Sequence, residues 1–396
     1  MTRRGDSSSA DMRYARPSPA EIVLGPSSAG VPVAVPAATG SARESLETEI
    51  LASMSDGACF VSFSGGRDSS AVLAVAVRAA RSAGLPDPRP ITLRYPGDAD
   101  SDETRWQEMV LEHLGIEDRI VIDITTPATY LDEVVRANLR SRGLVWPPAL
   151  QLDDPVLDAA RGGTLLTGEG GDEVLGTRRV TPLALLLKMR RRPNRRLLRW
   201  AGESLVPRRL NHGAVRRGLE GSPMWRWLTP RGREELVQRT ASADDRPLHW
   251  GQETIDMISH RVPDLLRRNY QAVADEHDVT LAHPLLSPPF LAALAAEGGR
   301  WGYAGRTHLM RVLFSDLLPD ELLSRSTKAH FGAVRWRDAE REFARAWDGS
   351  GLAADLVDVE ALRAEWLSER PAGSSALALH AAWLHSEGLS LEGDER

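Results

Sequence analysis

The stretch ACFVSFSGGRDSS, residues 58–70, runs directly into the apolar segment AVLAVAV, residues 71–77. Its first part is rich in aromatic and β-branched residues, which predicts a short buried strand over residues 58–63. The small residues that follow predict a tight turn, and the apolar segment predicts a buried helix from Ser69 onward. A strand, a glycine-rich turn and a helix in this order are typical of an α/β fold.

The same alternation continues along the chain. Further strands are predicted at residues 90–95, 119–124 and 164–167. Helices are predicted between them, at residues 103–114, 131–139 and 155–160. Strands separated by helices of this length predict a parallel sheet with helices on both faces. Ligands of such sheets bind beyond the carboxyl ends of the strands.

We expect the chain to have three parts. Residues 1–40 are rich in Ser, Ala, Pro and Gly without periodicity, which predicts a disordered N-terminal arm. Residues 41–180 form the predicted α/β domain, which begins with a capping-box pattern at Ser41 and Glu44. Residues 181–396 form a largely helical region on the substrate side of the sheet edge. Its helical patterns lie at residues 183–187, 234–237, 255–270 and 376–383.

Composition excludes several classes of protein. The 396 residues carry a formal net charge of -6 and include one cysteine, Cys59. One cysteine forms neither an internal disulfide nor a cysteine-based zinc site, and the net negative charge argues against nucleic-acid binding over the whole surface. No apolar run is long enough to cross a bilayer, and the N-terminus lacks a signal-peptide pattern. We therefore expect a cytoplasmic protein with no membrane partner.

The loop after the first strand has the features of a phosphate-binding site. Gly65 and Gly66 let the backbone approach an anion closely, and Ser64, Ser69 and Ser70 supply hydroxyl groups. The free N–H groups at the start of the following helix point to the same place. The sequence matches neither a Walker A motif nor a dinucleotide fingerprint. A plain glycine turn capped by one of the serines is the alternative interpretation.

Acidic residues accompany both glycine-rich loops. Asp68 places a negative charge where phosphates would bind, which is unfavourable unless a cation such as Mg²⁺ bridges them. The second loop, TGEGGDEVLG at residues 167–176, holds Glu169, Asp172 and Glu173 and follows another predicted strand. Because both loops end strands of one sheet, we expect Asp68 and Asp172 to share one Mg²⁺ on the pyrophosphate of ATP. A solvated acidic turn is the alternative for the second loop.

Together these motifs resemble the synthetase domain of the asparagine synthetase family, which includes β-lactam synthetases and lasso-peptide cyclases. Two more segments resemble the family: YPGDADSDETRWQEMVLEHLG at residues 95–115 and LLPDELLSRSTKAHF at residues 317–331. The resemblance runs from about Ser41 to about Trp336. It implies the PP-loop ATP pyrophosphatase fold, which is adenine nucleotide alpha hydrolase-like. It also implies an ATP- and Mg²⁺-dependent ligase of specialised metabolism that adenylates a carboxylate, releases pyrophosphate and joins the acyl group to an amine.

The resemblance assigns roles to single residues. It implies that the pyrophosphate and nucleoside of ATP lie against Ser62, Ser64, Gly65, Gly66, Asp68, Ser69, Ser70, Leu93, Thr167 and Gly168. Glu169 stands where the family handles the proton of the amine, and a carboxylate whose pKa is raised by acidic neighbours suits that task. Lys328 stands where a lysine stabilises the charged transition states, as a compact ammonium can.

The chain also departs from the family. Thr2 stands in place of the cysteine nucleophile of the glutaminase domain, and we expect the arm before Ser41 to be too short for such a domain. The nucleophile is then free ammonia, an amine substrate, an amine on the carboxylate substrate, or ammonia from a partner amidotransferase. Near Pro284, the places of a Glu, an Arg and an Asp are held by Thr280, Ala282 and Ser287. The missing arginine argues against free aspartate and leaves a small-molecule or peptide carboxylate, free or on a carrier.

Three other functions stay open. One is asparagine synthesis from aspartate and ammonia. Another is tRNA thiolation by the same type of loop, which the lone Cys59 disfavours. The third is an ATP-binding scaffold without turnover. The arginine-rich stretch Lys188–Trp200, with further arginines up to residue 217, is interpreted as a solvated helical face, so a nucleic-acid partner is not expected.

Overall fold

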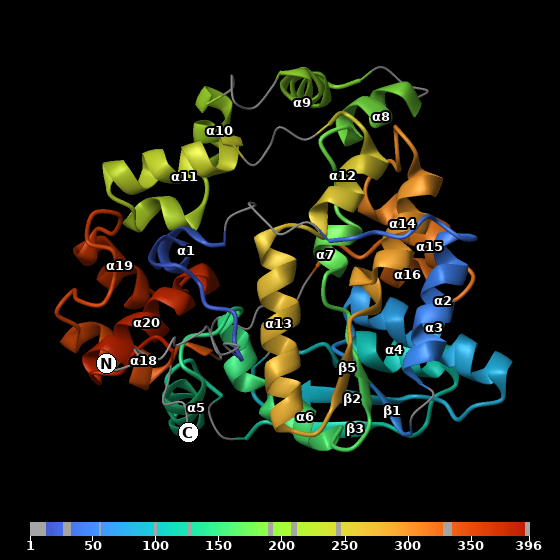
Figure 1. The fold of residues 1–396 in the computed structure, drawn as a ribbon, viewed down its shortest axis with the longest axis horizontal. Coiled ribbons are helices and arrows are strands. Elements are labelled where there is room, and N and C mark those ends of the chain that lie inside the picture. Colours follow the sequence, from blue (N-terminus) through green and yellow to red (C-terminus); the bar gives the residue numbers. More distant parts are fainter. Residues whose placement is uncertain are drawn as a thin grey trace, which may run out of the picture.

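The computed structural model describes residues 13–26, 33–54, 57–98, 101–125, 128–188, 193–206, 212–242, 247–327 and 335–392. Within these residues, five parallel strands form one sheet between layers of helices (Figure 1). The strands are β1 (Cys59–Ser62), β2 (Arg89–Arg94), β3 (Ile120–Asp123), β4 (Thr164–Leu166) and β5 (Thr280–Ala282). The predicted fold class, a parallel α/β sheet followed by a mainly helical region, is confirmed.

The strand order, β3-β2-β1-β4-β5, places β1 in the middle of the sheet. Val61 of β1 is paired with Pro90 of β2 on one side and with Leu166 of β4 on the other. The order of the strands reverses between β1 and β4. Such a switch point is where open parallel sheets bind ligands, and both glycine-rich loops leave the sheet there.

Alternate strand residues pack on opposite faces of the sheet. Val61 and Leu166 belong to a core with α2, α3, α4 and α14, whereas Phe60 and Leu165 belong to a core with α6 and α13. These helices are α2 (Ala42–Ser53), α3 (Arg67–Ala83), α4 (Thr104–Leu114), α6 (Asp154–Ala159), α13 (Arg261–Glu276) and α14 (Pro288–Gly298). The period-2 alternation of the strands therefore fixes which helices cover which face.

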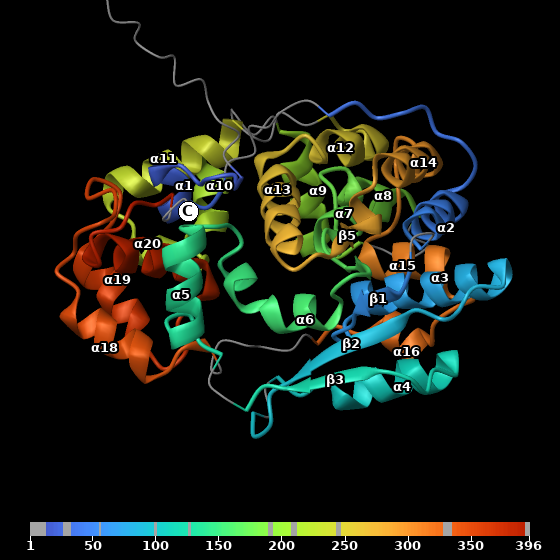
Figure 2. The ribbon, with the colours of Figure 1, turned by 60° about the horizontal axis from the view of Figure 1, so that its bottom comes forward.

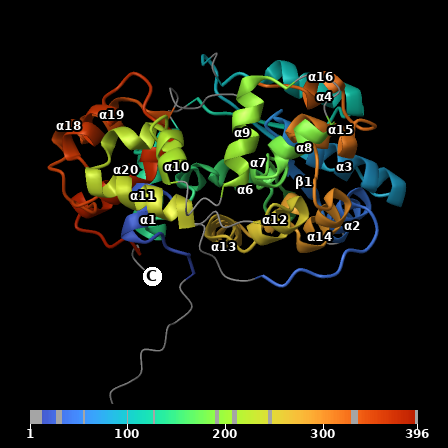
Figure 3. The ribbon, with the colours of Figure 1, turned by 90° about the horizontal axis from the view of Figure 1, so that it is seen from above.

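A second helical core lies beside the sheet (Figure 2; Figure 3). It buries Trp227 and Trp366 almost completely and joins segments from both ends of the chain. Its elements are α1 (Pro19–Leu24), α5 (Glu133–Arg142), η3 (Pro223–Trp227), α11 (Pro230–Ser242), α18 (Asp338–Ala346), α19 (Val359–Trp366) and α20 (Ala376–Ser386).

The remaining elements are η1 (Pro148–Leu152), α7 (Gly171–Val174), α8 (Thr181–Lys188), α9 (Arg195–Leu205), α10 (His212–Leu219), α12 (Trp250–Met257), η4 (Pro284–Leu286), α15 (Arg306–Phe314), α16 (Asp320–Leu323) and η5 (Gly373–Ser375). Of these elements, α12, α15 and α16 also pack in the core that contains α2 and α3. Helix α7 follows β4 and η4 follows β5, so both lie at the carboxyl edge of the sheet. In the part of the chain that the structure describes, no helix has the length and apolar character that crossing a membrane requires.

The prediction of a disordered arm over residues 1–40 is wrong for part of that segment. Residues 13–26 are folded, and α1 begins with a capping box formed by Ser18 and Glu21. Tyr14 and Ile22 are buried, each against a different core. The composition of residues 13–26 does not predict this packing, because the helices that these residues contact lie far along the chain.

Two further elements differ from the sequence predictions. The helix predicted over residues 255–270 is two helices, α12 and α13, which residues 258–260 separate. Strand β5 was not predicted, because its pairing with β4 and not a local pattern makes these three residues a strand. The capping box predicted at Ser41 and Glu44 is present at the start of α2.

Candidate active site

The first glycine-rich loop joins β1 to α3 in a shape that requires glycine. Gly65 has a φ of +81°, and a Cβ atom there would lie 2.8 Å from Cγ of Gln107. Ser69, in the first turn of α3, turns its hydroxyl back toward Ser64, with 3.1 Å between the two Oγ atoms. Gln107 donates from Nε2 to the carbonyl oxygen of Ser64 at 3.2 Å. The loop is thereby held around the N-terminal end of α3.

The second glycine-rich loop packs directly on the first. A Cβ atom at Gly168 would lie 2.7 Å from the backbone nitrogen of Ser69. At Gly171, a Cβ atom would lie 2.3 Å from Cγ of Asp68. No side chain fits in either place, so the glycines of the second loop are what allows the two loops to touch.

Arg306, from the start of α15, joins the acidic residues of both loops. Its Nη2 lies 2.6 Å from each carboxylate oxygen of Asp68, and its Nη1 forms an ion pair with Asp172. Burial raises the pKa of Asp68, and the charge of Arg306 opposes that rise. The structure therefore brings Asp68 and Asp172 together around the guanidinium of Arg306, and the Mg²⁺ predicted between them stays a prediction.

Glu169 lines both of the adjoining cavities that open at the carboxyl edge of the sheet. Its backbone N–H donates to Oγ1 of Thr167 at 3.2 Å, and that hydroxyl lies 2.6 Å from Nδ1 of His283. Burial lowers the pKa of His283 to about 4, so the ring beside this hydroxyl is neutral. The carboxylate of Glu169 contacts Tyr270 of α13, with 3.4 Å between Oε1 and the phenol oxygen.

Arg325 fixes the segment that follows α16 against the first loop. Its Nη2 lies 2.5 Å from Oε1 of Glu103, and its Nη1 donates to the carbonyl oxygen of Gly65 at 3.3 Å. Its guanidinium carbon lies 4.5 Å from the ring centroid of Trp106. Thr327, two residues further on, lines the site. Lys328 lies outside the described residues.

Two adjoining cavities open at the carboxyl edge of the sheet. The larger, about 490 Å³, is lined by Ser62, Ser64, Gly66, Asp68, Ser69, Gly168, Glu169 and Asp172 among the predicted residues. The smaller, about 160 Å³, is lined by Leu93 and Thr167 and shares Ser62, Ser64 and Glu169 with the larger one. Gly65 shapes the turn without lining either cavity. Ser70 is fully buried in α3 and also lies away from both.

Sequence reasoning missed several residues of the site. Arg306, Arg325, Tyr270 and Asp153 line these cavities and carry no recognisable motif of their own. Arg306 is 238 positions from Asp68, so no local pattern connects the two. Arg325 stood only three positions before Lys328 in a segment already singled out, and that was the one available signal.

The acidic residues fit a magnesium ion. Mg²⁺ commonly binds one or two carboxylates together with substrate phosphates and water, rather than a cage made wholly of protein groups. Asp68 and Asp172 provide two converging carboxylates, and the described residues hold no cluster of three or more potential metal ligands. These two side chains suit a metal that arrives with a nucleotide.

Fold and site together define a class of protein: an α/β protein with two glycine-rich loops at the point where the strand order of its parallel sheet reverses, which is where such sheets bind ligands. A family model described as asparagine synthase matches residues 43–387. The chain belongs to the asparagine synthase family, and it is by class an ATP-dependent ligase that forms amides.

Comparison with individual proteins adds little to this assignment. Among solved structures, the chain resembles NAD+ synthetase from Burkholderia pseudomallei, with 19% sequence identity and a TM-score of 0.22. The match covers 66% of this chain and 98% of that chain. No curated protein matches the chain.

Proposed function

We propose that this protein activates a substrate carboxylate by adenylation with ATP, releases pyrophosphate, and transfers the acyl group to an amine. The observation that carries the proposal is the convergence of Asp68, Asp172 and Glu169 in one cavity beyond the ends of β1 and β4. Family membership supports the same chemistry.

The two cavities suit the two parts of ATP. The smaller cavity has an apolar part of its lining that includes Ile91 and Leu93, which suits a nucleoside. The larger has the Ser64 and Ser69 hydroxyl groups and the N-terminal end of α3, which suit the phosphates. Asp68 and Asp172 would hold the magnesium ion, whose charge offsets that of the phosphates.

Arg306 and Arg325 add fixed positive charge to the phosphate cavity. Both line the cavity, and neither is mainly exposed. A guanidinium can donate two parallel hydrogen bonds to a phosphate, so Arg306 is placed to contact the pyrophosphate as it leaves. Lys328 is proposed to stabilise the charged transition states in which the acyl-adenylate forms and reacts.

Glu169 is proposed as the group that removes the proton of the attacking amine. It is the carboxylate of the second loop that lines both cavities, and so lies where the nucleoside and phosphate parts meet. An amine must lose a proton to form a stable amide, and a carboxylate within reach can accept it. We place the protein in specialised metabolism, because Ala282 at the end of β5 offers no cation for the second carboxylate of aspartate.

ATP–pyrophosphate exchange tests the proposal. Purified protein is screened with pools of amino acids, aryl acids and peptides, with Mg²⁺ present. We expect exchange with one pool, and its loss in Asp68→Ala. Asp87→Ala, which removes an aspartate paired with Arg81 at the surface, is the matched control and is expected to keep exchange. Exchange that persists in Asp68→Ala contradicts the mechanism.

Asparagine formation is the alternative function within the same family. Supplying aspartate with ammonia, or with glutamine and a partner glutaminase, distinguishes the two. Product formation from aspartate would show that the loss of the family's arginine at Ala282 does not exclude this substrate.

A further inference from the structure

Behind Glu169 lies a second carboxylate, Asp153, and one tyrosine connects them. The phenol oxygen of Tyr270 lies 3.4 Å from Oε1 of Glu169. Asp153 interacts with the same phenol, since each of these two groups shifts the pKa of the other. Tyr270 is buried, with 9% of its surface exposed. All three residues line the smaller cavity. Tyr270 thus interacts with both carboxylates within one cavity.

The single hydroxyl hydrogen of Tyr270 couples the protonation of the two carboxylates. Tyr270 has one hydrogen to donate and two carboxylates to receive it, so one carboxylate must be protonated for both contacts to be hydrogen bonds. Burial raises the pKa of Tyr270 well above its ordinary value, so the phenol stays protonated and cannot act as a base. The phenol of Tyr270 can therefore only relay a proton: its oxygen accepts one proton while its own hydroxyl proton leaves.

We propose that Asp153 is the final acceptor of the proton that Glu169 takes from the amine, with Tyr270 as the relay. This inference rests on the proposed function. In the step, the O–H bond of protonated Glu169 breaks as its proton bonds to the phenol oxygen of Tyr270. The phenol's own O–H bond breaks as that proton bonds to Asp153. Glu169 returns to a carboxylate, Tyr270 to a hydroxyl, and charge is conserved.

The surroundings of Asp153 suit an acceptor that works near neutral pH. Burial raises the pKa of Asp153 to about 6, Asp154 adds to the rise, and Arg335 and Arg142 oppose it. Tyr95 also faces this carboxyl group. At pH 7 Asp153 is therefore mostly ionised and able to accept. Asp153 holds a proton more tightly than an ordinary carboxyl group does, so the transfer returns Glu169 to its ionised form.

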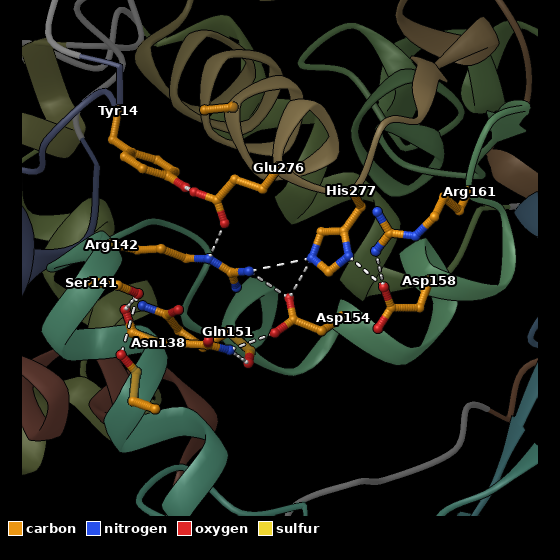
Figure 4. Close-up of polar contacts among 12 residues, drawn as sticks. Tyr14, Asn138, Ser141, Arg142, Gln151, Asp154, Asp158, Arg161, Glu276 and His277 are labelled. Atoms are coloured by element: carbon orange, nitrogen blue, oxygen red, sulfur yellow. Dashed lines mark hydrogen bonds and ion pairs between the residues drawn. The ribbon is translucent and has the colours of Figure 1, made fainter. Parts of the chain in front are cut away.

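A buried ionic network fixes the two elements that carry the relay (Figure 4). Arg142 of α5 lies 2.7 Å from Asp154 of α6 and 2.7 Å from Glu276 of α13. His277 contacts Asp154 at 3.2 Å. Asp153 adjoins Asp154, and Tyr270 lies on the helix that ends at Glu276, so this network sets the spacing between them.

Two kinds of measurement test the relay. The first needs no substrate: carbon-13 NMR of carboxyl-labelled Asp and Glu follows both groups with pH, and Asp153→Asn and Glu169→Gln assign the signals. We expect a titration near pH 6 that both carboxyl groups report, and its separation into independent titrations in Tyr270→Phe. Titrations that are independent in the wild type, or still coupled in Tyr270→Phe, would overturn the relay.

The second measurement separates activation from amide formation. Asp153→Asn and Tyr270→Phe are expected to slow amide formation about 10- to 100-fold more than they slow pyrophosphate exchange. Wild-type amide formation should fall below about pH 6, and Asp153→Asn should remove that dependence. Tyr303→Phe, a buried tyrosine outside both cavities, is the control. Equal losses of pyrophosphate exchange and amide formation would overturn the relay. Absence of exchange in the wild type would instead overturn the proposed function, and then no amine would supply the proton that the relay carries.

Discussion

The floor and the roof of the site are built in different ways. The floor consists of the two glycine-rich loops, in which residues a few positions apart in sequence face the same cavity. The roof consists of Arg306, Arg325 and Tyr270, whose partners in the floor are 238, 260 and 101 positions away. The difference teaches that the acidic and glycine residues of such a site are local patterns, while the groups that balance their charge are long-range contacts.

The largest expected effect is on the roof. Arg325→Ala leaves Glu103 buried without its cation, which we expect to lower the free energy of unfolding by about 3–5 kcal/mol. Arg105→Ala removes a similar pair with Glu321, but both partners are exposed, at 72% and 53%, so its cost is expected to stay below about 1 kcal/mol. Urea denaturation measures both. Equal costs for the two variants would mean that burial does not distinguish the pairs.

The same division decides what the sequence could predict. The strands at residues 58–63 and 164–167 and the loops after them were predictable, because periodicity and glycine placement act over a few residues. The roles of Glu169 and Lys328 came from a family resemblance, and they stay predictions. Arg306 was not predictable, since an arginine's partner 238 positions away leaves no local trace. Strand β5 was missed for a related reason: its pairing with β4 is what makes it a strand.

We also expect the stability of the protein to depend on pH, because of a histidine that follows β5. Burial lowers the pKa of His283, just after β5, from 6.5 to about 4. The unfolded chain therefore binds a proton before the folded protein does, so stability is full above about pH 6.5 and falls as the pH drops toward 4. The expected loss from this group is up to about 3 kcal/mol.

Unfolding free energies measured between pH 7 and pH 4 test this dependence. His283→Asn should give a shallower decline than the wild type, because its side chain does not titrate. His385→Asn, at an exposed histidine, should leave the decline unchanged. His380, which is also buried with its pKa lowered to about 4, keeps part of the decline in every variant. An identical slope in His283→Asn would place the dependence elsewhere.

A smaller effect is expected from the cation that joins the two loops. Arg306→Ala removes the shared partner of Asp68 and Asp172 and one positive charge near the phosphates, so kcat/KM for ATP should fall about 10- to 100-fold. Arg306→Lys keeps the positive charge and should recover only part of this loss, because an ammonium lacks the paired donors of a guanidinium. Arg311→Ala, on the same helix but paired with exposed Asp320, is the control. Equal rates for Arg306→Ala and Arg311→Ala would remove Arg306 from the site.

The smallest effect is expected where the sequence was most informative. At the start of α2, Ser41 Oγ accepts from the N–H of Glu44 at 3.1 Å, and the Glu44 carboxylate accepts from the N–H of Ser41 at 2.8 Å. Ser41→Ala removes one of these bonds at an exposed helix end, which costs about 1 kcal/mol. Thr48→Ala, further along the same helix, removes a hydroxyl without a capping role and should be nearly neutral. If Ser41→Ala proved as costly as Arg325→Ala, stability would lie in local patterns as much as in long-range contacts, and the contrast between floor and roof would fail.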